Sequence, residues 1–227
     1  MKNQTLKYLI YPFSLVLLIC LSACYEIIDD FGHTGNISGR VLDPSGNIIS
    51  GDVTTEDMVV LALGEGETEP MRIRVLGDGT YTNTHMYPQV YRVWLSGAAE
   101  GSQEHTVDLR GGPVTQDITA TPFLTLPPPE VVGSPTAEEV TISFTISPNN
   151  GHVPEERSVY VSTVFYPGQS TGSGPYWTTI RRTLSDNEGN ITIDGLQSGT
   201  TYYIRTAARA TGTNWFNLSD QTIVTLP

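Results

Sequence analysis

Hydrophobic and polar residues alternate along short runs of this chain, and glycine, asparagine and proline separate the runs. Residues 36–42 and 140–146 alternate, which places one face of a strand in a core and the other in water. Residues 58–63 are more continuously apolar, as in a central strand. No run has the spacing of an amphipathic helix, so the pattern predicts an all-β protein. Further strands are expected near residues 71–75, 81, 90–95, 114–120, 159–161, 177–184, 191–193, 202–209 and 222–226.

Three consecutive prolines at residues 127–129 mark the clearest boundary in the chain. Such a run favours a stiff, extended linker. The blocks on either side, residues 35–126 and 130–227, each have the length that one β-sandwich requires. We therefore expect two consecutive β-sandwich domains.

The N-terminus has the pattern of an export signal. Lys2 and Lys7 precede an apolar run over residues 8–21, and Leu21-Ser22-Ala23-Cys24 follows. This stretch resembles the lipobox of bacterial lipoproteins, which implies a signal peptide over residues 1–23, a lipid on Cys24 and a tether over residues 24–34. The alternatives are a soluble secretion signal with a chance cysteine and a membrane helix, but the run is shorter than the ~20 residues that a spanning helix needs.

Composition excludes several kinds of chemistry from the two blocks. Both lysines lie in the signal, so all basic residues after it are arginines and no lysine is left for a Schiff base or a phosphate loop. The two cysteines are Cys20 in the signal and the lipidated Cys24, which leaves no thiol chemistry. The net charge of −12 argues against nucleic acid and anionic lipid as partners.

The second block carries a family motif. Residues 196–205, Leu-Gln-Ser-Gly-Thr-Thr-Tyr-Tyr-Ile-Arg, resemble the corner between two strands of fibronectin type III domains. The resemblance implies that Tyr202 is the corner tyrosine, its hydroxyl bonding to upstream backbone, and that Ile204, Thr206 and Ala208 face inward. Ser198 stands where the family usually has proline, which is a mild departure.

The first block is similar to prealbumin-like or carboxypeptidase-regulatory-like sandwiches, on residues 37–43, 46–49, 78–81 and 91–93. The order of signal, acidic tether, prealbumin-like sandwich and fibronectin-like sandwich resembles a Bacteroidetes lipoprotein family of unknown function. Members usually accompany the outer-membrane transporter and glycan-binding lipoprotein of polysaccharide-utilisation systems. The acidic residues after Cys24 also resemble surface-export signals of these lipoproteins, although a solvated linker would have the same composition.

Polar clusters give little reason to expect an enzyme. The four histidines, at 33, 85, 105 and 152, are far apart and are interpreted as solvated loop residues, so no metal site is expected. Residues 186–190 are rich in side-chain oxygen atoms of the kind that bind calcium, but a hairpin turn explains this composition as well. The pairs Glu138-Glu139 and Glu155-Glu156 are adjacent on strands, so each pair points to opposite faces and cannot act as a catalytic dyad.

Aromatic side chains are the remaining candidates for function, because sugar rings stack on exposed aromatic faces. Tyr176, Trp177 and Trp215 in the second block and Tyr87 in the first lie near expected loops or strand ends. The alternative is that each of them is a core or cross-strand packing residue.

These observations predict a non-catalytic lipoprotein without a cofactor, anchored to the outer membrane by its lipid and exposed at the cell surface. We expect an accessory glycan-binding or scaffold component of a polysaccharide-uptake system, whose partners are a glycan, the transporter and the glycan-binding lipoprotein. The alternative is a structural assembly subunit that binds proteins through strand edges. An enzyme would require two distant carboxylates to meet in one pocket.

Overall fold

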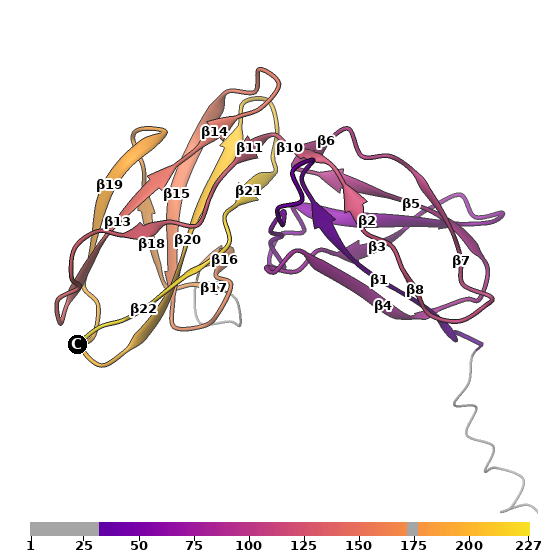
Figure 1. Ribbon diagram of the computed structural model, residues 1–227, viewed down its shortest axis with the longest axis horizontal. Coiled ribbons are helices and arrows are strands. Elements are labelled where there is room, and N and C mark those ends of the chain that lie inside the picture. Colours follow the sequence, from indigo (N-terminus) through magenta and orange to yellow (C-terminus); the bar gives the residue numbers. More distant parts are fainter. Residues whose placement is uncertain (1–31, 172–176) are drawn as a thin grey trace, which may run out of the picture. The chain divides into compact units, whose positions relative to one another are not determined.

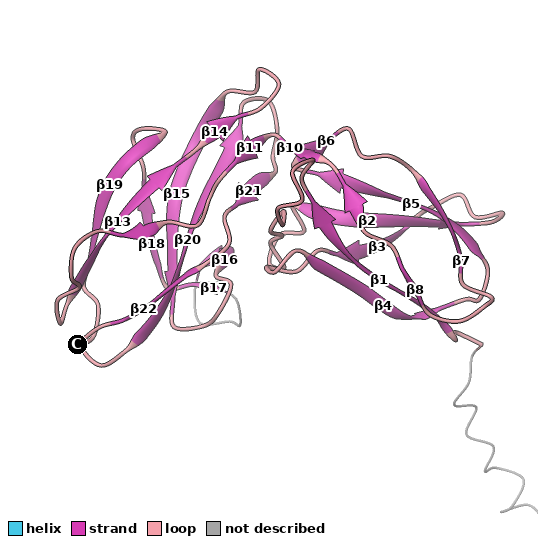
Figure 2. Cartoon of the chain, viewed as in Figure 1, coloured by secondary structure: helices cyan, strands magenta, loops and turns pink. Residues whose placement is uncertain are grey.

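The computed structural model describes residues 32–171 and 177–227, and its strands form two β-sandwiches (Figure 1). The residues described contain no helix, and loops and turns connect the strands (Figure 2). The expectation of an all-β chain with two consecutive sandwiches is therefore confirmed. Residues 34–227 form one compact unit. Within the two described ranges no helix is long and apolar enough to span a bilayer.

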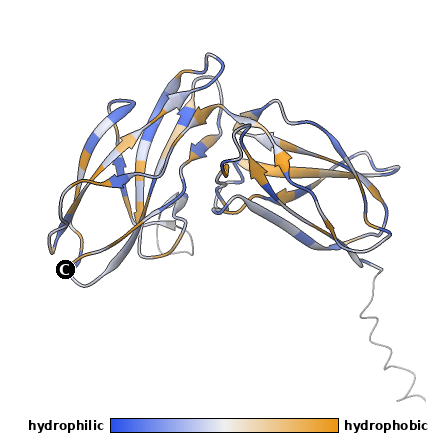
Figure 3. Ribbon diagram, viewed as in Figure 1, coloured by the Kyte–Doolittle hydropathy of each residue, from blue (hydrophilic) through white to orange (hydrophobic). Residues whose placement is uncertain are grey.

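The first sandwich has two sheets of mixed and antiparallel strands. One has the order β4-β1-β8, with β9 also paired to β1, and the other has the order β3-β2-β5-β7. The continuously apolar strand β2 is central in its sheet, as its sequence predicts, and Figure 3 colours it hydrophobic. The bounds are β1 Gly35–Leu42, β2 Met58–Gly64, β3 Met71–Arg74, β4 Thr80–Met86, β5 Val90–Gly97, β7 His105–Asp108, β8 Val114–Thr115 and β9 Ile118–Thr119.

The second sandwich packs a three-stranded sheet, β12-β13-β19, against the sheet β18-β15-β20-β21, in which β22 also pairs with β20. In β13 buried and less buried residues alternate, which confirms the prediction for residues 140–146. The bounds are β12 Glu130–Val131, β13 Glu139–Thr145, β15 Pro154–Ser162, β18 Ile180–Thr183, β19 Glu188–Asp194, β20 Thr201–Ala210, β21 Phe216–Leu218 and β22 Thr222–Thr225.

Three short ladders complete the fold. They are β6 (Ala99–Glu100) with β10 (Thr121–Pro122), β11 (Leu124–Thr125) with β14 (Ser147–Pro148), and β16 (Gly168–Thr171) with β17 (Trp177–Thr178). Strand β11 precedes the three prolines, yet its partner β14 lies in the second block. The backbone is therefore paired immediately before the prolines and again immediately after them, at β12.

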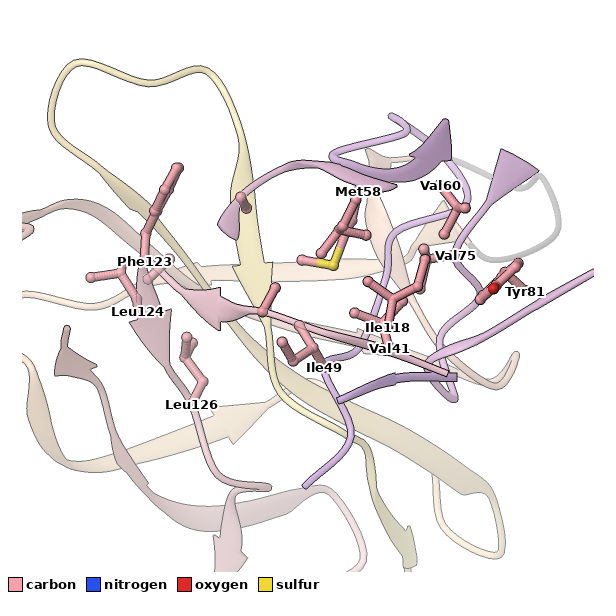
Figure 4. Close-up of a cluster of buried hydrophobic side chains, with 14 of the residues drawn as sticks. Val41, Ile49, Met58, Val60, Val75, Tyr81, Ile118, Phe123, Leu124 and Leu126 are labelled. Carbon is pink, nitrogen blue, oxygen red and sulfur yellow. The ribbon is translucent and has the colours of Figure 1, made fainter. Parts of the chain in front are cut away.

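Buried hydrophobic residues of both sandwiches belong to one contiguous cluster. Figure 4 shows part of it, with Ile49 and Met58 from the first block and Leu124 and Leu126 from the segment that leads to the prolines. Burying apolar area stabilises a fold by about 25 cal/mol per Å², so the connecting segment adds to the core and is more than a spacer.

One expectation about the second block was wrong. Residues 186–190 are not a hairpin turn, because β18 pairs with β15 whereas β19, which begins at Glu188, pairs with β13, so residues 184–187 connect the two sheets. Ile204, Thr206 and Ala208 are buried, as the resemblance implies, and Arg205 and Ala207 on the other face of β20 are equally buried. The face that carries Arg205 meets residues of the first block, as described below.

Candidate functional site

The predicted aromatic residues do not form one surface in the described part of the chain. Tyr87, with 53% of its surface exposed, follows β4 at the end of the first sandwich that carries Gly35. Trp215, 42% exposed, precedes β21 in the second sandwich. Tyr176 lies outside the described residues, as do the side chain of Trp177 and the predicted lipidation site, Cys24.

Tyr202 has the hydrogen bond that a corner tyrosine makes. The backbone N–H of Gln197, five residues upstream, donates to its hydroxyl at 3.0 Å. The tyrosine side chain is buried, so this bond satisfies its hydroxyl and holds the chain where it enters β20. Its role is structural.

The clustered acids form ion pairs. Glu155 Oε2 lies 2.9 Å from Arg209 Nη1, and Glu156 Oε1 lies 2.5 Å from Arg181 Nη2. Both carboxylates are therefore engaged by arginines of neighbouring strands and do not face each other across a cleft, as a catalytic pair would. Among residues 32–171 and 177–227 no group of three or more histidine, cysteine or acidic side chains could hold a metal ion.

His152 differs from the expected solvated loop histidine. Its ring packs on Phe123 with a centroid distance of 4.3 Å, and its Nε2 lies 3.5 Å from Glu100 Oε2. Asn150 donates to the other oxygen of the same carboxylate at 2.6 Å. The ring therefore helps to join the two blocks.

A hollow of about 540 Å³ lies beside the outer face of the sheet β3-β2-β5-β7. Three of its lining residues face each other across neighbouring strands: Leu63 on β2 pairs with Arg92 on β5, which pairs with Thr106 on β7. The loop of residues 64–67 closes one side, where Glu67 accepts hydrogen bonds from the Gly64 N–H and from the Gln89 amide. Its volume lies within the range of ligand pockets, ~300–1,000 Å³.

Trp94 lies on the same face of β5 and was not among the residues predicted from the sequence. Tyr91, Val93 and Leu95 point into the core, so Arg92 and Trp94 point outward. Trp94 is half-buried, and Leu61 lies directly opposite it on β2. The alternation of residues 90–95 could have identified it, because a large aromatic residue occupies a position where a polar residue is expected.

A second hollow, of about 290 Å³, lies between the two blocks. Its apolar lining includes Ile48 and Ile49 from the first block, residues 124–128 from the connecting segment and Leu218 from β21. Asp43 and Asp220 stand among the polar lining residues. The hollow has no aromatic residue in its lining, which makes it a poor surface for a sugar ring.

Arg205 lies beside this junction and is completely buried. Its Nε donates to the Ser219 carbonyl at 2.7 Å, and its Nη2 donates to the Ser50 hydroxyl at 2.8 Å and to the Gly51 carbonyl at 3.2 Å. Nη1 donates to the Pro167 carbonyl at 3.4 Å. The motif of residues 196–205 includes this arginine but does not reveal its burial, because its partners Ser50 and Gly51 are more than 150 residues away.

The charge of Arg205 is stabilised by dipoles. Among the described residues no carboxylate forms a salt bridge with it, and its guanidinium lies 5.6 Å from the centre of the Tyr166 ring. Burial lowers the pKa of Arg205 to about 10, against the field of Asp52 and Asp220, which raises it. The side chain therefore stays charged at neutral pH.

Two buried aspartates of the first block also face the second. Asp52 Oδ2 accepts from the Gln169 N–H at 2.7 Å. Burial raises the pKa of Asp57 to about 6, and the neighbouring Asp52 charge adds to this rise, whereas hydrogen bonds from the Phe216 backbone and from Thr55 oppose it. Asp57 thus titrates close to neutrality within the junction.

The fold as a whole is shared with solved structures of low sequence identity. A DUF3823 family protein from Parabacteroides merdae matches with a TM-score of 0.68 and 18% identity, over 84% of this chain and 98% of that chain. A protein from Bacteroides uniformis named "putative carbohydrate binding protein" matches with a TM-score of 0.67 and 18% identity, over 86% of this chain and 100% of that chain. A DUF3823 family protein from Bacteroides ovatus has a TM-score of 0.64 and 17% identity, over 86% and 100%.

No family model matches this chain, and no curated protein does. At 17–18% identity the likeness shows a common fold, which extends over both sandwiches. It agrees with the resemblance to a Bacteroidetes family of unknown function. Of these three proteins, two are named only by the DUF3823 family and one is named for carbohydrate binding.

Proposed function

We propose that this protein binds carbohydrate and catalyses no reaction. The observation that carries the proposal is the full-length match to the Bacteroides uniformis protein named for carbohydrate binding, which covers 86% of this chain and all of the other. The surface chemistry supports it, because the hollow beside β5 combines an apolar floor with charged and hydroxyl side chains, as ligand pockets do.

The proposed setting is the bacterial outer membrane. The lipobox-like residues 21–24 support a lipid anchor at Cys24, from which the protein would face the cell surface. There it would act as an accessory component of a polysaccharide-uptake system, beside an outer-membrane transporter and its glycan-binding lipoprotein. The acidic composition supports a neutral glycan as ligand, because a net charge of −12 repels polyanions.

A glycan panel tests the proposal directly. The full chain, held in a detergent without a sugar headgroup, would be measured by calorimetry against neutral and acidic oligosaccharides. We expect binding to at least one neutral oligosaccharide in the micromolar to millimolar range, with a shallow salt dependence. Failure to bind any member of a broad panel would reject carbohydrate binding.

An assembly role is the second candidate, and the hollow between the blocks favours it. Its lining is mainly aliphatic and proline-rich, and Ile48 is half-exposed beside it, as in a protein-binding groove. A photo-crosslinking residue at position 48, with one at the exposed Val153 as control, would test this on intact cells. Crosslinks to an outer-membrane transporter from position 48 alone would support assembly, and equal labelling from both positions would count against it.

A further inference from the structure

The outer side of β5 presents an unusual set of residues for a solvent-facing sheet. We use the name β5 face for Leu61 and Leu63 on β2, Arg92 and Trp94 on β5, and Thr106 on β7. All five alternate with buried residues, so their side chains lie on the side of the sheet opposite the core. The β5 face thus includes one large aromatic residue, Trp94, on a central strand of the sheet.

Strand register brings these residues into two rows. In the first row, Leu61 on β2 lies between Trp94 on β5 and Arg72 on β3. Leu63, Arg92 and Thr106 form the second row, which lines the hollow of about 540 Å³. Directly opposite residues on neighbouring strands have Cβ atoms ~4.5–5.5 Å apart. Arg92 and Trp94 are two residues apart on the same face of β5, so the guanidinium and the indole are neighbours, and Arg92 lines the hollow.

Carboxylates outnumber guanidinium groups in the lining of the hollow beside the β5 face. Arg92 Nη1 lies 3.2 Å from Glu104 Oε2, and both side chains remain about half exposed. Glu56 pairs with Arg74 at 2.7 Å and with Arg72 at 3.4 Å. Glu65 and Glu67 also line the hollow, and Glu67 accepts hydrogen bonds from the Gly64 N–H and the Gln89 amide. An anionic ligand would therefore meet an excess of carboxylates, and it would have to break the Arg92–Glu104 ion pair in order to bind. The guanidinium and carboxylate groups still offer free donors and acceptors to a neutral ligand.

Sugar hydroxyls are both donors and acceptors, and the C–H face of a pyranose ring is apolar. The half-buried indole of Trp94 with Leu61 beside it matches that apolar face. Arg92 as donor, Glu104 as acceptor and Thr106 as either match hydroxyls at the edge of the ring. Because the face lies across strands held by backbone hydrogen bonds, it is rigid before the ligand arrives.

We infer that the β5 face is the carbohydrate-binding site and that it takes a neutral oligosaccharide, with Trp94 as the stacking residue. The inference rests on the proposed function and specifies where that function is located. It assigns the main contact to the first sandwich, in place of the aromatic residues predicted in the second. Trp94 has an apolar neighbour in Leu61, and the next outward residue on its strand, Arg92, forms an ion pair and lines the hollow.

The test compares single variants of the full chain against an oligosaccharide that the unmodified chain binds. Trp94→Ala is expected to weaken binding at least ten-fold, because the stacking surface is lost. Trp94→Phe keeps part of that surface and is expected to weaken binding less than Trp94→Ala does. Ile223→Ala, which truncates an exposed apolar residue on β22, is the matched control and is expected to leave affinity unchanged.

A chemical footprint keeps the inference testable if Trp94→Ala fails to fold. N-bromosuccinimide oxidises accessible indoles, and mass spectrometry of the unmodified chain reports each tryptophan separately. We expect saturating oligosaccharide to protect Trp94 at least five-fold and to leave Trp215 unprotected.

The outcomes separate the two proposals. Binding that persists in a folded Trp94→Ala variant, or protection of Trp215 in place of Trp94, would overturn the site assignment and leave carbohydrate binding standing. Absence of binding to every oligosaccharide in the unmodified chain would overturn carbohydrate binding, and the site assignment with it.

Discussion

The outer faces of two sheets in this protein use arginine in opposite ways. On the β5 face Arg92 is 54% exposed and pairs with a carboxylate. On the face of β20 that meets the first block, Arg205 has no exposed surface and donates to three carbonyl groups and a hydroxyl. The exposed arginine keeps donors free for a ligand, whereas the buried one donates within its own block and across to the first block.

The difference shows why an outward position on a strand does not by itself indicate a binding surface. Arg92 and Arg205 both lie on strands, and both point away from the core of their own sandwich. What separates them is the chain segment that covers one face and leaves the other open. Covering makes each buried donor or acceptor that loses its partner costly, so the covered face should be far less tolerant of substitution.

The largest effect is expected for Arg205→Met. The substitution leaves the carbonyls of Gly51, Pro167 and Ser219 without their donor in a buried site, which should lower the free energy of unfolding by about 3 kcal/mol or more. Urea denaturation would measure this. The matched Arg92→Met variant should change stability by less than about 1 kcal/mol, since exposed ion pairs contribute little. Equal losses would show that the two faces do not differ.

Asn217 provides the next comparison, between a buried and an exposed amide. Its Nδ2 donates to the Ala98 carbonyl at 2.8 Å, and its Oδ1 accepts from the Leu124 N–H at 3.0 Å. Asn217→Leu should therefore cost about 2 kcal/mol, because the Leu124 N–H loses its partner and the Ala98 carbonyl, which also accepts from the Phe123 N–H, loses one of its two. Gln89→Leu removes an amide that bonds to the exposed Glu67 and should cost less than about 0.5 kcal/mol by the same denaturation measurement.

The junction should also make stability depend on pH through Asp57. Its pKa in the folded state, about 6, lies above the usual 3.8, so folding favours the protonated form. The resulting stabilisation is complete below pH ~4 and is lost as pH rises through about 6, by roughly 3 kcal/mol. Asp57→Asn should remove this dependence and be more stable than the unmodified chain at pH 7.5. A difference curve between the two that stays flat from pH 4 to 7 would contradict the assignment.

The smallest effects concern two buried tyrosines. Tyr202→Phe removes a hydroxyl that accepts from the Gln197 N–H and should cost about 1 kcal/mol. The hydroxyl of Tyr160, on the covered face, has no hydrogen-bond partner among the described residues, so Tyr160→Phe should be neutral or slightly stabilising. Thermal denaturation of both variants would compare them. A loss in Tyr160→Phe equal to that in Tyr202→Phe would show that its hydroxyl is hydrogen-bonded in solution.

The strands themselves could be predicted because their signals are local. The alternation at residues 36–42 and 140–146 and the apolar run at 58–63 correspond to β1, β13 and β2. Strand β21 could not be predicted, because it has only three residues and all of them are buried. Residues 186–190, which end the crossing between sheets and begin β19, have the composition of a hairpin turn. Only the pairing of β18 and β19 with different strands distinguishes a crossing from a hairpin.

The candidate site was only partly accessible to sequence reasoning. Trp94 could have been found, since the alternation of β5 places it beside Arg92. The hollow next to it could not, because it depends on how the loop of residues 64–67 folds over β5 and β7. The burial of Arg205 depends on Ser50 and Gly51, and no pattern within β20 reveals a partner so distant in the chain.

Strand β11 restricts how genes for such proteins can recombine. A break at the three prolines would leave Leu124 and Thr125 with the first sandwich and their partners in β14 with the second. It would also part Asn217 from Ala98 and Arg205 from Gly51. A gene fragment that encodes the second sandwich alone would therefore produce a domain in which Arg205 is exposed to water and a strand edge is unpaired. An unpaired edge promotes aggregation. Natural exchange of these domains should thus move both sandwiches together, as one heritable piece.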